Sequence, residues 1–177
     1  MQNKLSNDTY LPAEDTYFLE DHIKNEKGES ALDIGSGSGY LTKSLSKSFR
    51  FVVGTDVNLD ALKNQSNKPE NLVCCNGADA LQNKFDLIIC NMPYLASEEI
   101  FDVATDGGEE GVVIPMKIIK SAKNCLKQNG KFLFVSSSLS NYEKLAELTK
   151  NEGFDVEIKA KKKLFFEELI LISAIKR

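Results

Sequence analysis

The sequence has few of the residues from which metal centres and redox sites are built. Its 177 residues include one histidine, His22, and four cysteines, none of which forms a Cys-x-x-Cys pair. The four cysteines are Cys74, Cys75, Cys90 and Cys125, and three of them lie in apolar, strand-like segments. We therefore expect reduced, buried thiols and no metal site, since a redox-active Cys74–Cys75 pair would have no activating neighbour in the sequence.

Long apolar segments and an excess of positive charge are also lacking. No apolar run approaches the ~20 residues of a membrane span, and the first ten residues lack the apolar core and cleavage pattern of a signal peptide. The formal net charge is -4, which gives no general attraction to nucleic acids or anionic membranes. These absences favour a cytoplasmic protein and disfavour membranes and nucleic acids as partners.

The length and composition of the chain fit one soluble domain. Hydrophobic residues make up 42% of the chain and charged residues 27%, as in ordinary globular proteins. A chain of this length can bury roughly 70% of the surface that it exposes when unfolded. No repeat, linker or low-complexity segment divides it, so residues 1–177 are predicted to form a single domain.

Strand-like and helix-like segments alternate along the chain. Helices are predicted over residues 40–48, 59–66, 112–130 and 141–153. Strands are predicted over residues 30–35, 50–57, 71–75, 85–90, 131–138, 154–160 and 168–176. No helix separates the last two strands, so they should pair antiparallel. The pattern predicts an α/β three-layer fold whose mostly parallel, seven-stranded sheet gains an antiparallel strand from a C-terminal hairpin.

Capping and turn residues set the predicted boundaries. Asn58 can cap the helix that begins at residue 59, and Gly130 should end the helix that carries Pro115 in its first turn. Residues 91–111 show no period and are predicted to be a loop. The three lysines Lys161–Lys163 could contact phosphates of ribosomal or tRNA-like RNA, but they are more simply interpreted as a charged turn that protects the hairpin against edge pairing.

A glycine-rich segment follows the first strand, where ligands of parallel sheets bind. It reads "DIGSGSG", and Gly35, Gly37 and Gly39 allow the backbone to approach a ligand closely. A dinucleotide loop would have a third glycine at position 40, which is Tyr40. The spacing favours a ligand with a carboxylate-bearing arm over a pyrophosphate, although such turns also serve as plain connections.

Two carboxylates follow the next strands. Asp56 can accept both hydroxyl groups of a ribose, as the binding of NAD or S-adenosylmethionine requires, or it can cap the next helix. Asp79 lies where an adenine amino group would fall, with the backbone of Ala80 beside a ring nitrogen, or it is an ordinary loop acid.

The fourth strand ends in "NMPY", residues 91–94, which offers no acid, base or nucleophile. Together with "DIGSGSG", "TDV" and "ADAL", this segment resembles the amino-methylating S-adenosylmethionine-dependent methyltransferases, whose fourth motif is Asn/Asp-Pro-Pro-Tyr/Phe. "YLPAEDTYFLEDH" and "ATDGGEEGV" are similar to the HemK-like protein glutamine N5-methyltransferases, in their short eukaryotic and archaeal branch that acts on class 1 release factors. That branch lacks the long helical N-terminal domain of bacterial HemK proteins.

Met92 replaces the first proline of the family motif. Similar forms occur in rRNA adenine dimethyltransferases, so an N6-adenine methyltransferase acting on RNA or DNA is the alternative. The acidic charge and the C-terminal hairpin argue against it, because those enzymes have a basic face and a helical C-terminal domain. A subunit that has the fold but only binds a partner is a third possibility, which the set Asp33, Asp56, Asp79 and Asn91 disfavours.

The resemblance implies S-adenosylmethionine as the cofactor. The Thr16 hydroxyl would reach its methionine carboxylate, and Asp33 would orient its amino end. The complete implied set of cofactor-binding residues is Thr16, Asp33, Gly35, Gly37, Asp56, Asp79, Ala80 and Asn91. The short branch commonly works with a small zinc-binding activator subunit that pairs along the sheet edge.

Residues 91–94 would bind the substrate amide, with Asn91, Pro93 and Tyr94 in catalytic roles. The Asn91 side-chain oxygen and the Met92 carbonyl, turned by Pro93, would each accept one N–H, and the Tyr94 ring would lie against the planar group. No general base is needed, because the nitrogen loses its proton after methylation, and His22 is predicted to be a packing or surface residue. Residues 104–112 would cover the substrate groove, with Gly107 and Gly108 allowing movement, or form a plain surface loop.

Overall fold

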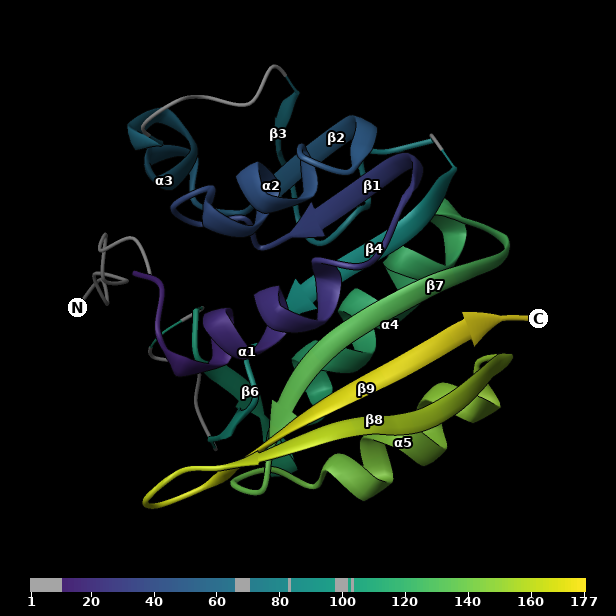
Figure 1. The fold of residues 1–177 in the computed structure, drawn as a ribbon. Coiled ribbons are helices and arrows are strands. Elements are labelled where there is room, and N and C mark those ends of the chain that lie inside the picture. Colours follow the sequence, from purple (N-terminus) through teal and green to yellow (C-terminus); the bar gives the residue numbers. More distant parts are fainter. Residues whose placement is uncertain (1–10, 66–70, 83, 98–101, 103) are drawn as a thin grey trace.

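The main sheet has seven strands in the order β3-β2-β1-β4-β7-β9-β8. The computed structural model describes residues 11–65, 71–82, 84–97, 102 and 104–177. The strands are β1 (Gly28–Ile34), β2 (Phe49–Asp56), β3 (Leu72–Cys74), β4 (Phe85–Asn91), β7 (Leu126–Ser137), β8 (Phe154–Lys163) and β9 (Glu168–Lys176). β9 runs antiparallel to both β7 and β8, and the other pairings are parallel. The predicted mostly parallel sheet with an antiparallel C-terminal strand is confirmed (Figure 1).

Helices cover both faces of the sheet and make the predicted three layers (Figure 1). On one face, α1 (Glu14–Ile23) and α2 (Tyr40–Leu45) contribute Leu19 and Leu45 to one apolar cluster. On the other face, α4 (Val113–Cys125) and α5 (Tyr142–Asn151) contribute Ile119 and Leu145 to a second cluster. The short α3 (Leu59–Asn64) lies beside β2 and β3, and Asn58 caps it as predicted. No helix in the described part of the chain is long and apolar enough to cross a membrane.

The prediction that a helix continues to Gly130 is wrong. Pro115 lies in the first turn of α4 as expected, but the helix ends at Cys125 and Leu126 begins β7. Leu126 pairs with Phe85, and the next pair along β4 is Leu87 with Lys131, so residues 127–130 bulge out between the two pairs. Pairing with the central strand β4 therefore overrides the helical pattern, and Asn129, rather than a glycine, takes the left-handed conformation at a φ of 60°.

The three lysines do not form a turn, which corrects the interpretation from the sequence. Lys161–Lys163 belong to β8 and pair with β9, and the turn follows them at residues 164–167. Because β8 is an edge strand, the charges still fit a role against edge pairing. The expectation of buried thiols holds for Cys90 and Cys125, while Cys74 is exposed because β3 forms the opposite edge.

Candidate active site

The candidate site lies where the strand order reverses. β1 pairs with β2 on one side and with β4 on the other, and Ile34 lies beside both Thr55 and Cys90. The segments that follow β1, β2 and β4 therefore leave the same edge of the sheet. This is the position at which open parallel sheets bind ligands.

The glycine loop after β1 is held against the end of β2. The amides of Gly35 and Ser36 both donate to the Thr55 carbonyl at 2.8 Å. Gly35 and Gly39 have φ values of 72° and 79°, a conformation that glycine adopts without strain. A Cβ atom added to Gly35 would meet nothing within 4 Å, whereas one added to Gly39 would lie 2.5 Å from Gln65 Oε1. Gly35 thus leaves a face open to a ligand, and Gly39 makes room for a neighbouring side chain.

The Asp56 carboxylate is held in place by two backbone amides. The Gly37 N–H donates to Oδ2 and the Asn58 N–H donates to Oδ1, each at 2.8 Å. Asp56 does not cap α3, because Asn58 accepts from the amides of Asp60 and Ala61 instead. Each carboxylate oxygen retains acceptor capacity in a half-buried position, so the group can receive two further hydroxyl donors.

Gln65 is a site residue that the sequence analysis missed. Its side chain is 5% exposed and donates from Nε2 to Ser36 Oγ at 3.2 Å and to the Gly37 carbonyl at 2.9 Å. Gly37 is therefore fixed on one side by Asp56 and on the other by Gln65. A glutamine just beyond a short helix carries no sequence signal for this role.

Asp33 lies fully buried beneath the same loop. Its Oδ2 accepts a hydrogen bond from the Thr42 hydroxyl at 2.6 Å. Burial raises the pKa of the carboxyl group from 3.8 to about 7, although the Thr42 bond opposes the shift. The role of Asp33 toward a cofactor amino group stays a prediction.

Asp33 is expected to make the stability of the free protein fall as pH rises from about 4 to about 7. The folded state keeps the proton up to about pH 7, whereas the unfolded chain releases it near the ordinary value of 3.8. The folded state therefore binds more protons in this window, and the free energy of unfolding decreases across it. Urea unfolding at several pH values should show the decrease in the parent and not in Asp33→Asn. Asp60→Asn, at an exposed acid, is the control, and equal pH profiles for the parent and Asp33→Asn would contradict the assignment.

Asp79 and Ala80 lie exposed in the turn that follows β3. This turn is tied to the end of β2, because the Cys75 N–H donates to the Asp56 carbonyl at 3.0 Å and the Thr55 hydroxyl donates to the Gly77 carbonyl at 2.7 Å. The turn is thus held beside Asp56, and contacts of Asp79 and Ala80 with an adenine ring stay a prediction.

Asn91 ends β4 with a buried acceptor that lacks a hydrogen-bond partner. Its Oδ1 is one of three such side-chain atoms in the described part of the chain, the others being Gln65 Oε1 and Ser97 Oγ. A buried polar atom without a partner costs ~1–3 kcal/mol. At the end of β4, where the sheet edge is expected to bind a ligand, Asn91 Oδ1 is an acceptor that a ligand N–H could satisfy. The Met92 side chain is 2% exposed and packs into the apolar cluster beneath α4 and α5. The position at which the sequence departs from the family motif is therefore a packing position.

Tyr94 lies between α1 and the hairpin. Its half-buried ring packs against the apolar cluster on the α1 face. Burial and the nearby carboxylates of Asp15 and Glu167 raise the pKa of its hydroxyl group well above the ordinary value. Tyr94 thus stays neutral, with two acceptors near its hydroxyl. The sequence analysis identified neither Asp15 nor Glu167 as a neighbour of Tyr94.

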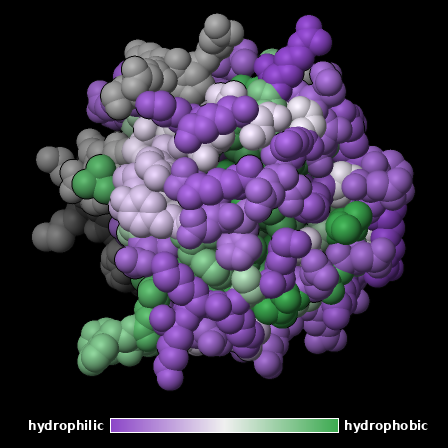
Figure 2. Space-filling view, viewed as in Figure 1, coloured by the Kyte–Doolittle hydropathy of each residue, from purple (hydrophilic) through white to green (hydrophobic). Residues whose placement is uncertain are grey.

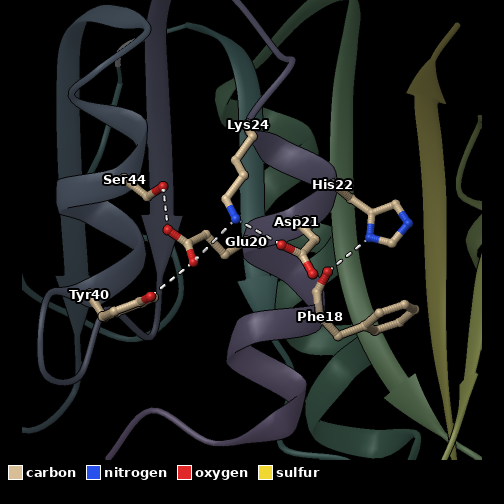
Figure 3. A network of polar contacts seen from close by, with 7 residues as sticks. All are labelled: Phe18, Glu20, Asp21, His22, Lys24, Tyr40 and Ser44. Carbon is tan, nitrogen blue, oxygen red and sulfur yellow. Dashed lines mark hydrogen bonds and ion pairs between the residues drawn. The ribbon is translucent and has the colours of Figure 1, made fainter.

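Helix α1 brings Thr16 to this site and is fastened to α2. Thr16 is 6% exposed, and its hydroxyl donates to Asp15 Oδ1 at 3.2 Å. Glu20 accepts hydrogen bonds from the Tyr40 hydroxyl at 2.9 Å and from the Ser44 hydroxyl at 3.1 Å, which links α1 to α2 (Figure 3). A contact between Thr16 and a cofactor carboxylate stays a prediction.

The only histidine of the chain packs within α1, as predicted. His22 Nδ1 lies 2.8 Å from the Phe18 carbonyl oxygen, and the two rings meet edge to face with centroids 4.9 Å apart (Figure 3). His22 therefore has a structural role.

Residues 91–111 were predicted to be a loop, and their described part is not a plain loop, while residues 98–101 and 103 lie outside the described residues. The described part includes β5 (Leu95–Ala96), β6 (Asp106–Gly108) and a 3-10 turn, Glu109–Gly111. A Cβ atom on Gly107 would lie 2.7 Å from the Pro93 carbonyl oxygen, and one on Gly111 would lie 2.2 Å from that of Tyr94. These glycines allow close packing on the Asn91–Tyr94 segment, and a covering role over a substrate groove stays a prediction.

The chain resembles known proteins along most of its length. The family model described as methyltransferase small domain matches residues 14–166. A Methanocaldococcus jannaschii protein, provisionally named as a protein N5-glutamine methyltransferase, is 34% identical over 97% of this chain and 93% of its own length. A release factor glutamine methyltransferase of Bradyrhizobium diazoefficiens is 30% identical over 72% of this chain, which spans 52% of that relative.

Solved structures share the fold. A chain in the E. cuniculi Mtq2–Trm112 complex, described as responsible for methylating the eRF1 translation termination factor, matches with a TM-score of 0.81 and 23% identity. That match covers 96% of this chain and 99% of the other. The ribosomal protein L11 methylase of Lactobacillus delbrueckii subsp. bulgaricus matches with a TM-score of 0.63 and 17% identity over 91% of this chain and 76% of its own.

Proposed function

Because the chain belongs to the methyltransferase small domain family, we propose that it methylates the side-chain amide nitrogen of a glutamine in a class 1 peptide chain release factor, with S-adenosylmethionine as the methyl donor. The glutamine would lie in a glycine-flanked loop, because glycines beside it remove the Cβ atoms that would strike the rim of the site. The names of the relatives support this substrate class.

The residues at the strand ends fit the proposed cofactor. Gly35 leaves open space on its ligand-facing side, and Asp56 presents a carboxylate whose orientation two amides fix. We infer that Asp56 accepts the ribose hydroxyls and that Asp79 and Ala80 lie at the adenine. Thr16, Asp33 and Asn91 would surround the methionine portion. When bound, S-adenosylmethionine supplies a methyl group made electrophilic by its sulfonium.

The orphaned Oδ1 atom of Asn91 is the observation that carries the proposal. An amide nitrogen is a weak nucleophile, because its lone pair is delocalised into the carbonyl. Asn91 Oδ1 and the Met92 carbonyl would accept its two N–H groups and so stabilise the positive charge that develops on nitrogen. Tyr94, kept neutral beside Asp15 and Glu167, would hold the amide plane in position for transfer.

The same acceptors would serve an adenine amino group, so the substrate class depends on other features. The net charge is -4, and two of the three lysines of the hairpin are paired, Lys161 with Glu168 and Lys162 with Glu14, which disfavours binding of phosphates there. These features favour a protein substrate over RNA or DNA.

A partner subunit is the second part of the proposal. The E. cuniculi neighbour was solved as a complex of two proteins. Here the edge strand β3 lies beside exposed Val57 and Leu59, at 48% and 49% exposure, and carries the exposed Cys74. We propose that a small activator subunit pairs along this edge. That the subunit binds zinc remains a prediction from the family resemblance.

Incubation with labelled cofactor should label a purified release factor and leave bulk RNA unlabelled. Mass spectrometry is expected to find a gain of roughly 14 Da on the glutamine of the glycine-flanked loop. Binding through six to ten phosphates would weaken ~10³–10⁵-fold between 50 and 200 mM salt, so we expect a much weaker salt dependence. Methyl groups found only on adenine would establish the nucleic-acid alternative instead.

A further inference from the structure

The tip of the β8–β9 hairpin presents two phenylalanines to solvent. Phe165 is 91% exposed and Phe166 is 86% exposed, the highest values among the large hydrophobic side chains of the described residues. Their rings meet edge to face with centroids 4.6 Å apart. Figure 2 shows apolar side chains projecting at the lower left, where Figure 1 places the hairpin tip. Hairpin turns usually favour small polar residues and glycine, so the fold itself gives no reason for an aromatic pair.

The base of the hairpin is fixed, although its tip projects. The Ser138 N–H donates to the Glu168 carbonyl at 2.9 Å, and Lys161 forms an ion pair with Glu168 at 3.3 Å. Lys162 forms a second ion pair with Glu14 of α1 at 2.7 Å. A fixed base presents the two rings in a defined position, which lowers the entropy lost when they bind a partner.

The aromatic pair adjoins the candidate active site. Glu167 follows Phe166 directly, and consecutive Cα atoms are separated by ~3.8 Å. Asn91 pairs with Val135 of β7, and Ser137, two residues further along β7, donates a hydrogen bond from its hydroxyl to the Glu167 carboxylate. The same carboxylate helps to raise the pKa of the Tyr94 hydroxyl group. The hairpin turn is thus anchored at the end of β7 that lies beside Asn91, so a folded protein bound over the site is expected to meet the tip.

We propose that Phe165 and Phe166 form an apolar docking point for the folded release factor, on the surface beside its methylated loop. The inference rests on the proposed function and assigns a substrate-recognition element to it. Aromatic side chains, phenylalanine among them, are enriched at protein interfaces relative to the rest of the surface. The activator subunit is proposed for β3, at the opposite edge of the sheet, so it does not compete for these rings.

The charges around the tip also favour a protein partner over an anionic membrane. Glu167 and Glu168 follow the rings, and two of the three preceding lysines, Lys161 and Lys162, have carboxylate partners, which leaves Lys163 as the one exposed lysine of the three for which no ion pair is seen among the described residues. A membrane-binding tip would combine aromatic residues with unpaired cations.

The test compares kinetics of the parent protein and a Phe165→Ala/Phe166→Ala variant, with the activator present if the parent needs it. For the folded release factor we expect the variant to raise KM roughly tenfold, with kcat and cofactor affinity close to the parental values. Methylation of a short glycine-flanked glutamine peptide should be unchanged, because the peptide has no surface for the rings. A Phe165→Leu/Phe166→Leu variant should recover most of the affinity.

The matched control is Ile175→Ala, which removes an apolar side chain of 40% exposure at the other end of β9. A double alanine variant with the parental KM for the release factor would overturn the docking point and leave the proposed function intact. A parent that does not methylate the release factor would overturn both. Phenylalanine-dependent binding to anionic lipid vesicles, or phenylalanine-dependent dimerisation, with KM unchanged would assign the rings to a membrane or to a second copy instead.

Discussion

Asn91→Ala is expected to lower kcat at least ~100-fold, because it removes an acceptor aimed at the charge that develops on the substrate nitrogen. Oδ1 is buried and has no hydrogen-bond partner among the described residues, so its loss should leave the fold stable. Removing an unsatisfied buried atom can even raise the free energy of unfolding. We therefore expect a loss of turnover without a loss of stability. Single-turnover kinetics at saturating cofactor, together with urea unfolding, would measure the two effects.

Ser97→Ala is the matched control for Asn91→Ala. Ser97 Oγ is also buried and without a partner, but no step of the proposed mechanism uses it. It should keep nearly parental turnover. An Asn91→Ala variant that retained more than about a tenth of the parental kcat would mean that another group polarises the amide.

Asp56→Ala is expected to weaken cofactor binding by roughly 2–4 kcal/mol, or about 30- to 1000-fold in Kd. Two ribose hydroxyls would lose a charged acceptor, and the amides of Gly37 and Asn58 would lose the group that now fixes them. Calorimetry with S-adenosylmethionine and with its demethylated product measures the change directly. NAD is not expected to bind either protein.

Asp60→Ala provides a control with the same change of charge. Asp60 lies in the first turn of α3, and its exposed carboxylate is 3.7 Å from the Lys63 ammonium group. Its removal should leave the cofactor Kd close to the parental value. Equal affinities for Asp56→Ala and the parent would show that the ribose binds elsewhere.

Local patterns in the sequence determined most of the fold. Apolar runs identified the seven strands of the main sheet, because a strand buried on both faces is apolar along most of its length. The Asn58 cap and the position of Pro115 were also read correctly, because their effects depend on nearby backbone groups. The motifs after β1, β2, β3 and β4 were sufficient to indicate the methyltransferase family, and they predict a site at the edge of the sheet where these strands end.

Contacts between distant segments were decided only by the tertiary structure. Gln65 donates a hydrogen bond to the Gly37 carbonyl, 28 residues earlier in the sequence. Glu167, near the C-terminus, raises the pKa of the Tyr94 hydroxyl group in the middle of the chain. The end of α4 followed from pairing with β4, which no helical pattern within residues 112–130 could reveal. The burial of Met92 and the missing partner of Asn91 Oδ1 likewise depend on which side chains pack around the end of β4. Neighbouring residues in the sequence specify local backbone preferences. Which side chains are buried, and which polar groups find hydrogen-bond partners, depends on how distant segments pack in the folded protein.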